Sequence, residues 1–183
     1  MVQQAFCVDL GRCVGCNACR VACKEIRRLN PDVQRRVVHD LPEDLVASPL
    51  RNYLTIGCNH CDDPACMKGC PAGAYSKNEL GIVMHDKKRC IGCKLCAWTC
   101  PYNVPCYDAE AGVMDKCDLC YRGQLEGREP ACVANCPTLA IKVMDVRNVP
   151  SDYQWGVAGY PDVRLTGANI FVKLPAVVDQ VRR

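Results

Sequence analysis

Most cysteines of this chain fall into four sets with a repeated spacing. The sequence has 183 residues and 18 cysteines, and each set opens with C-x2-C and closes with C-x3-C. Thiolates at this spacing bind [4Fe–4S] clusters, so the sequence predicts four such clusters and an electron carrier. The sets are Cys13, Cys16, Cys19 and Cys23; Cys58, Cys61, Cys66 and Cys70; Cys90, Cys93, Cys96 and Cys100; and Cys117, Cys120, Cys132 and Cys136.

Two other uses of cysteine fit the pattern less well. A disulfide scaffold is typical of shorter secreted chains and gives no reason for four C-x2-C repeats. Structural zinc sites usually join two separate C-x2-C units, whereas three cysteines in a C-x2-C-x2-C run suit a cubane. Proline follows Cys70, Cys100 and Cys136, as it follows the bacterial cluster run. We therefore favour clusters over zinc and disulfides.

Each cluster is expected to take its ligands from two sets. In two-cluster ferredoxins the last cysteine of each run ligates the other cluster. The alternative is sequential pairing, of set one with set two and of set three with set four. Iron is expected only at these cysteines, with no separate metal site. Nested pairing gives Cys13, Cys16, Cys19 and Cys136 for cluster 1; Cys117, Cys120, Cys132 and Cys23 for cluster 2; Cys58, Cys61, Cys66 and Cys100 for cluster 3; and Cys90, Cys93, Cys96 and Cys70 for cluster 4.

The repeats divide the chain into two ferredoxin-like units. Residues 53–110 form the inner unit, with sets two and three and a predicted hairpin between Cys70 and Cys90. Residues 1–30 plus 111–145 form the outer unit, with sets one and four. The predicted fold class is α+β, with two bacterial-ferredoxin-like units, one nested inside the other, and loop-rich insertions.

Local patterns predict the elements of the outer unit. Phe6–Leu10 is a short apolar strand leading into the first set, and a strand follows the turn after Cys136. No proline follows Cys23, so the chain is expected to continue there as a helix.

Two segments lie outside the cluster units. The insertion at 31–52 and its flanks carry arginines that we expect to be solvated: Arg27, Arg28, Arg35, Arg36 and Arg51. Residues 146–183 form a cysteine-free tail, expected to bind a partner or to cover the clusters as a lid.

Several residues near the sets are expected to pack rather than to bind iron. Cys7 is predicted to be buried on the first strand, and Cys106 to be a packing residue outside the cluster environment. His60 is predicted to be a hydrogen-bonding or surface residue, since its set already has four thiols. Tyr75, Trp98 and Tyr102 are predicted to pack in the core or to shield clusters.

Other functions find no support in the composition. A net charge of +3 is too small to favour nucleic acid. No apolar stretch is long enough for a membrane span, and no phosphate-binding loop or nucleophile motif is present. The start of the sequence shows no secretory pattern, so the cytoplasm is expected, with export on a signal-bearing partner as the alternative.

Two motifs identify a family. The run from Cys58 to Cys66 resembles the second cluster motif of the iron–sulfur subunits of dimethyl sulfoxide reductase and polysulfide reductase. The run Lys116–Tyr121, followed by Glu129–Cys132 and Cys136, resembles their fourth motif. The resemblance implies four [4Fe–4S] clusters in a wire, nested pairing, and a large partner with a molybdenum or tungsten pterin site. Some nitrate-reductase-type members replace a ligand of the third set by Trp, but Cys96 is retained here, so a cubane is expected.

The sequence therefore predicts a subunit without a catalytic site of its own. It would carry electrons between the pterin-metal subunit and a further redox donor or acceptor. Similar chains serve tungsten enzymes such as the tungsten-dependent benzoyl-CoA reductase. The alternative is a free polyferredoxin that shuttles electrons between several enzymes, which the slight positive charge disfavours because free ferredoxins are usually acidic.

Overall fold

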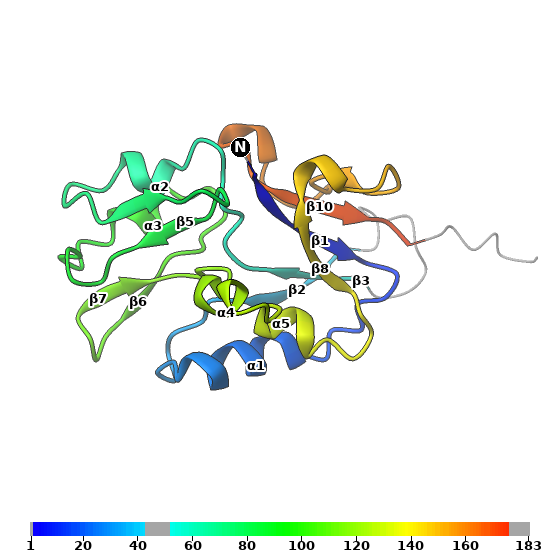
Figure 1. Cartoon of the computed structure of the whole chain (residues 1–183), viewed down its shortest axis with the longest axis horizontal. Coiled ribbons are helices and arrows are strands. Elements are labelled where there is room, and N and C mark those ends of the chain that lie inside the picture. Colours follow the sequence, from blue (N-terminus) through cyan, green and yellow to red (C-terminus); the bar gives the residue numbers. More distant parts are fainter. Residues whose placement is uncertain (1, 43–51, 176–183) are drawn as a thin grey trace, which may run out of the picture.

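The main sheet of the protein is built around its N-terminal strand. In the computed structural model, which describes residues 2–42 and 52–175, β1 (Gln4–Asp9) lies between β8 (Ile141–Asp145) and β10 (Ile170–Lys173). It is antiparallel to β8 and parallel to β10, and β9 (Gln154–Trp155) adds an edge (Figure 1). The four residues at the centre of β1 are all buried, as in a strand covered on both faces. The strands predicted before the first set and after Cys136 are confirmed.

Three antiparallel pairs complete the strands. They are β2 (Val37–Leu41) with β3 (Asn52–Ile56), β4 (Tyr75–Lys77) with β5 (Val83–His85), and β6 (Cys106–Asp108) with β7 (Val113–Asp115). The β4–β5 pair is the predicted hairpin. The β6–β7 pair was not expected, and β2 lies in the predicted insertion. Two-stranded pairs are marginal alone, so their stability depends on packing against the rest of the protein.

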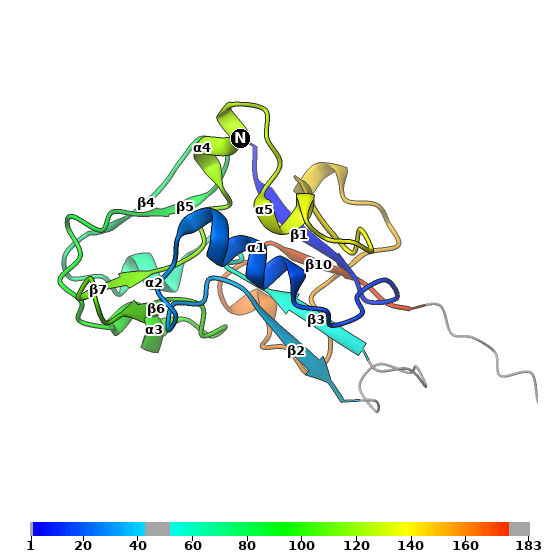
Figure 2. The ribbon, with the colours of Figure 1, turned by 90° about the horizontal axis from the view of Figure 1, so that it is seen from below.

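Helices begin inside or beside the cysteine sets. The longest, α1 (Ala18–Arg27), continues from the first set as predicted and lies beside α5, and α2 lies beside α3 (Figure 2). Three of the other helices end just before a proline that follows the last cysteine of a set. The proline leaves room for one helical turn or little more, so these helices are short. The short helices are α2 (Ala65–Lys68), α3 (Leu95–Thr99), α4 (Tyr121–Leu125) and α5 (Ala131–Ala134), with 3-10 turns at Val146–Asn148 and Val163–Leu165.

Cysteines form part of the hydrophobic core. Members of sets one, two and four pack with apolar side chains from β1, β8 and the loops between the sets. This shared core is where the predicted outer unit meets the predicted inner one. Its buried members are Phe6, Cys19, Cys58, Ile82, Cys117, Leu119, Cys132 and Ile141.

The described part of the tail packs against the second set. It supplies β9, β10 and the second 3-10 turn. Thr166 Oγ1 donates to Cys61 Sγ at 3.1 Å, and the Asn169 side-chain amide donates to the His60 carbonyl at 2.9 Å. Residues 176–183 of the tail and 43–51 of the insertion segment lie outside the described residues. In the part that is described, no helix is long and apolar enough to cross a membrane.

We predict that the tail strand is integral to folding. Ile170 of β10 is 1% exposed, so Ile170→Ala should lower the free energy of unfolding by about 2–5 kcal/mol. Anaerobic denaturant unfolding would measure the change. Leu174→Ala is the control, since Leu174 is 41% exposed and should change stability by less than about 0.5 kcal/mol. Equal stability of the two variants would contradict the structural role of β10.

Candidate iron–sulfur sites

The same backbone turn precedes the second cysteine of all four sets. The residue directly before that cysteine has positive φ each time: 70° at Gly15, 45° at His60, 67° at Gly92 and 52° at Leu119. Glycine takes this conformation freely. In His60 and Leu119 it is strained, so it persists only where the surroundings hold it. Four different local sequences therefore converge on one arrangement of the first two thiols.

Backbone N–H groups point at cysteine sulfurs from both ends of the sets. Near the first cysteine of set four, Leu119 N donates to Cys117 Sγ at 3.3 Å. In sets two and four, the sulfur of the last cysteine accepts from the backbone N–H of the residue four positions later in the chain. Such bonds favour the charged thiolate that iron requires, and they tune cluster potentials. These second donors are Ala74 N to Cys70 Sγ at 3.4 Å and Ala140 N to Cys136 Sγ at 3.3 Å.

One cavity is lined by four thiols from two different sets. Cys58, Cys61 and Cys66 of set two surround it together with Cys100, the last cysteine of set three. The remaining wall is mostly apolar, with Tyr102 and Pro101 among its residues. All eighteen cysteines are free thiols. A donor set made only of sulfur, in an apolar pocket, fits a [4Fe–4S] cluster.

Sets one and four lie together in the fold. Burial raises the pKa of Cys13, and the nearby thiols of Cys19 and Cys136 raise it further. Burial likewise raises the pKa of Cys23 to about 11, with Cys132 adding to the effect. The last cysteine of each set is thus next to members of the other, and the β1–β8 pairing brings the two segments together.

Sets two and three are also neighbours, and the fourth set touches the second. Burial raises the pKa of Cys96, and thiols of Cys90 and Cys70 raise it further. Burial raises the pKa of Cys117, Arg36 partly lowers it, and thiols including Cys58 raise it again. The cysteines therefore form a continuous group through the interior.

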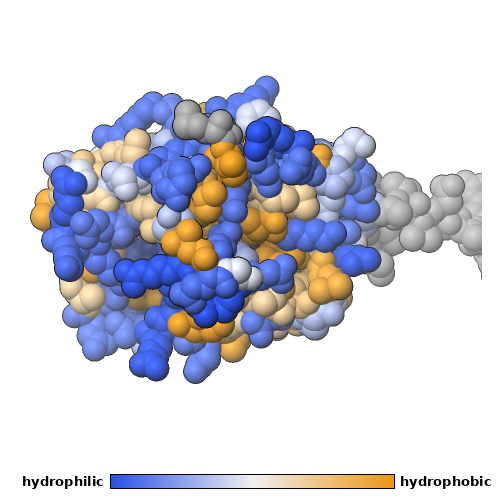
Figure 3. Space-filling model, in the orientation of Figure 1, coloured by the Kyte–Doolittle hydropathy of each residue, from blue (hydrophilic) through white to orange (hydrophobic). Residues whose placement is uncertain are grey.

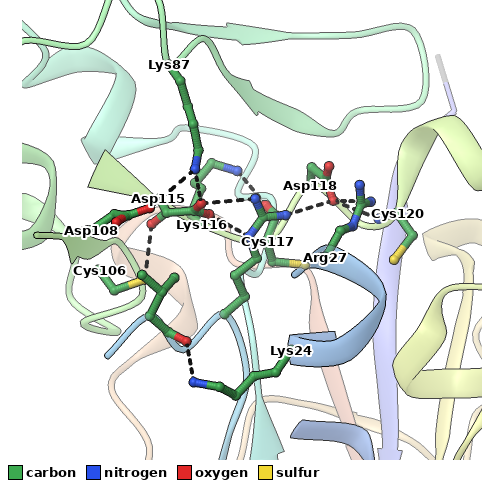
Figure 4. Close-up of polar contacts among 12 residues, drawn as sticks. Lys24, Arg27, Lys87, Cys106, Asp108, Asp115, Lys116, Cys117, Asp118 and Cys120 are labelled. Atoms are coloured by element: carbon green, nitrogen blue, oxygen red, sulfur yellow. Dashed lines mark hydrogen bonds and ion pairs between the residues drawn. The ribbon is translucent and has the colours of Figure 1, made fainter. Parts of the chain in front are cut away.

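An ion-pair network fixes the segment that leads into set four (Figure 4). The Asp115 carboxylate, 1% exposed, contacts Arg35 Nε and Lys87 Nζ at 2.5 Å each. Asp118, beyond Cys117, contacts Arg27 Nη2 at 2.7 Å. The network connects α1, the insertion and β7, so it holds both sides of the first ligand of set four.

The expectation of solvated arginines was therefore wrong for part of the group. Arg36 is buried and Arg35 is mostly so, because carboxylates and thiols draw them inward. Arg28 is exposed, as expected, and Arg51 lies outside the described residues. A second buried cation, Lys116, donates to the carbonyls of Cys117 and Val83 and lines the four-thiol cavity.

Most expectations for the other residues are confirmed. Cys7 is fully buried, Cys106 Sγ donates to the Asp115 carbonyl at 3.4 Å, and Tyr75 and Tyr102 are buried. His60 is a buried hydrogen-bonding residue, whose Nδ1 accepts from Val83 N at 3.1 Å. Trp98 was predicted to pack in the core or to shield a cluster, but it is 85% exposed and does not pack in the core.

This fold and its buried thiols define an iron–sulfur electron-transfer protein. Residues 51–146 match the family described as a 4Fe-4S dicluster domain. The chain is 41% identical over 181 residues to the probable anaerobic dimethyl sulfoxide reductase chain YnfG of Escherichia coli K12, covering 93% of this chain and 88% of that one. It is 39% identical over 143 residues to the thiosulfate reductase electron transfer subunit PhsB of Salmonella typhi, covering 76% and 74%.

A further relative is the iron-sulfur subunit of the nitrate-inducible formate dehydrogenase of Escherichia coli K12. It is 40% identical over 156 residues, which cover 76% of this chain and 53% of that protein. The chain belongs to this family of non-catalytic iron–sulfur subunits of oxidoreductase complexes.

We predict that the buried ion pair of Asp115 is needed for stability. Asp115→Asn should destabilise the fold by about 3–5 kcal/mol, because Arg35 and Lys87 lose the charge of the buried carboxylate that they share, and only Asp118, 3.4 Å from Arg35 Nη1, remains beside Arg35. Thermal unfolding of the anaerobic protein would measure it. Asp63→Asn is the control, since the exposed Asp63–Lys68 pair should contribute little. A loss no larger than that of the control would show that the network is dispensable.

Proposed function

We propose that the chain carries four [4Fe–4S] clusters as a wire to or from a large catalytic subunit with a molybdenum or tungsten pterin. The observation that carries the proposal is the turn before the second cysteine, which all four sets share. Because the four sets share this local geometry, we expect each set to bind the same kind of cluster. When bound, the clusters supply one-electron transfer; the protein holds them, excludes water and tunes their potentials.

Thiols of the paired sets lie near one another, which supports nested pairing of the ligands. Nested pairing in turn supports two nested ferredoxin-like units. The Cys58, Cys61, Cys66 and Cys100 thiols share one cavity, which is the set proposed for cluster 3. The electrostatic neighbours of Cys13, Cys23 and Cys96 likewise come from the sets proposed for clusters 1, 2 and 4.

Burial and proximity suggest the order of the wire. The charge of Cys19 acts on Cys132, which favours contact between clusters 1 and 2. The charge of Cys58 acts on Cys117, which favours contact between clusters 2 and 3. The pKa of Tyr75 is raised by burial and then by Cys96 of cluster 4 and by Cys66 and Cys58 of cluster 3, which favours contact between clusters 3 and 4. The proposed order is 1–2–3–4.

Electrons would enter and leave at the two ends of this order. Among the proposed ligands only Cys16 of cluster 1 and Cys93 of cluster 4 are exposed. Exposed apolar residues accompany both, including Val14 near the first and Trp98 near the second. Figure 3 shows one face of the molecule, on which apolar areas lie among polar ones. Contiguous exposed apolar areas mark sites of interaction with a partner. One end would contact the catalytic subunit and the other a further redox partner.

The nature of the partner is inferred from the relatives. Their names place them in a dimethyl sulfoxide reductase, a thiosulfate reductase and a formate dehydrogenase. We place the complex in the cytoplasm, with export on a signal-bearing partner as the alternative. No nucleic acid takes part.

The first prediction concerns cluster content. Native complex purified without oxygen should hold about sixteen iron atoms per chain and equal sulfide, four for each of four clusters. Molybdenum or tungsten should accompany a large co-purifying chain. Zinc without sulfide would refute electron transfer, and full iron in a solitary chain would indicate a free polyferredoxin instead.

The second prediction concerns ligand pairing. Under nested pairing, Cys136→Ser and Cys16→Ser remove the same cluster, so both variants should lose the same EPR signal. Under sequential pairing, Cys136→Ser should instead lose the signal that Cys93→Ser loses. Cys7→Ala lies outside every set and should keep all four clusters.

A further inference from the structure

A buried arginine lies among thiols of two different clusters. Arg36 is 2% exposed, and no carboxylate lies within 4.0 Å of its guanidinium in the described parts of the chain. Burial lowers its pKa, but the charges of Cys132, Cys117 and Cys19 outweigh that effect and raise it overall. An unpaired cation in a protein interior is costly, so this one is compensated by the sulfur ligands around it.

A hydroxyl connects the guanidinium to one of these sulfurs. Arg36 Nη1 donates to Thr55 Oγ1 at 3.1 Å. Thr55 Oγ1 lies 3.3 Å from Cys19 Sγ. A cysteine that ligates iron has no hydrogen on its sulfur, so with the cluster bound the Thr55 hydroxyl is the donor. Thr55 is itself buried. The contact to Cys19 is therefore a hydrogen bond polarised by a positive charge.

The surroundings hold Arg36 in one position. Its guanidinium carbon stacks 4.2 Å from the centre of the Phe6 ring. Gly57 leaves it room, since a Cβ there would stand 3.1 Å from Nη2. Nη2 is buried and has no hydrogen-bond acceptor among the described residues. A buried donor without an acceptor is what an added anionic group nearby would satisfy.

The geometry points to Arg36, acting with Thr55, as a positioning residue that raises the reduction potentials of clusters 1 and 2. This inference rests on the proposed function. Reduction adds a negative charge to a cluster, and a fixed cation in a medium of low dielectric favours that charge. Arginine stays protonated at all relevant pH values, so its effect would be constant. The thiols whose charges act most on Arg36 belong to clusters 1 and 2, and none belongs to cluster 4, which therefore serves as the internal reference.

EPR-monitored redox titration of the intact complex tests the inference. Arg36→Met should shift the one-electron reduction of clusters 1 and 2 at least tenfold toward the oxidised form, about 59 mV. Arg36→Lys keeps the charge and should restore most of the shift. Thr55→Val should lower the potential of cluster 1 alone, because it removes the bond to Cys19. Arg28→Gln is the control, since Arg28 is exposed and its charge is screened.

Iron and sulfide content is measured first, which separates this inference from the proposed function. Too little iron in the unmodified complex would refute the four-cluster proposal itself. Full content with unchanged potentials in Arg36→Met would overturn the role of Arg36. If Arg36→Met fails to assemble clusters, Thr55→Val decides, because it is nearly isosteric; an unchanged cluster 1 potential would then overturn the inference.

Discussion

Ionised sulfur in a protein interior is the constraint on which this structure depends. Iron binds the thiolate, yet burial favours the neutral thiol and raises the pKa of Cys66 to about 12. The fold offsets this cost locally with N–H groups, as from Ala140 to Cys136. It offsets the cost more broadly with Arg36 and Lys116, two cations buried without carboxylate partners in the described residues. The core therefore holds several polar and charged side chains among its apolar ones.

The same constraint explains why regular structure is sparse. The cysteines of a set must surround their cluster, so much of the chain forms tight turns. The strained φ angles of His60 and Leu119 lie in such turns. Short helices and two-stranded pairs fill the space between sets. The four-stranded sheet supplies the rigidity that these pieces lack, and β1 connects segments from both ends of the described chain.

An electron-transfer chain needs insulated centres inside and accessible ones at its ends. The distribution of burial has that form: Cys117 and Cys132 are buried, whereas Cys16 and Cys93 are exposed. Polar residues also occupy the places where sets meet, with Arg36 beside sets one and four and Lys116 between sets four and two. Substitutions there could alter potentials without touching a ligand.

The sequence by itself determined the features that depend on neighbours along the chain. Cysteine spacing predicted the thiol sets, and local patterns predicted β1, the β4–β5 hairpin and α1. Their physics is short-range, in turns, prolines and small residues. Only the tertiary structure decided that β10 joins the main sheet, that Arg35 and Arg36 turn inward, and that Trp98 faces solvent. Those outcomes depend on charges and surfaces distant in sequence: Asp115 draws in Arg35 from eighty residues away, and no local pattern carries that information.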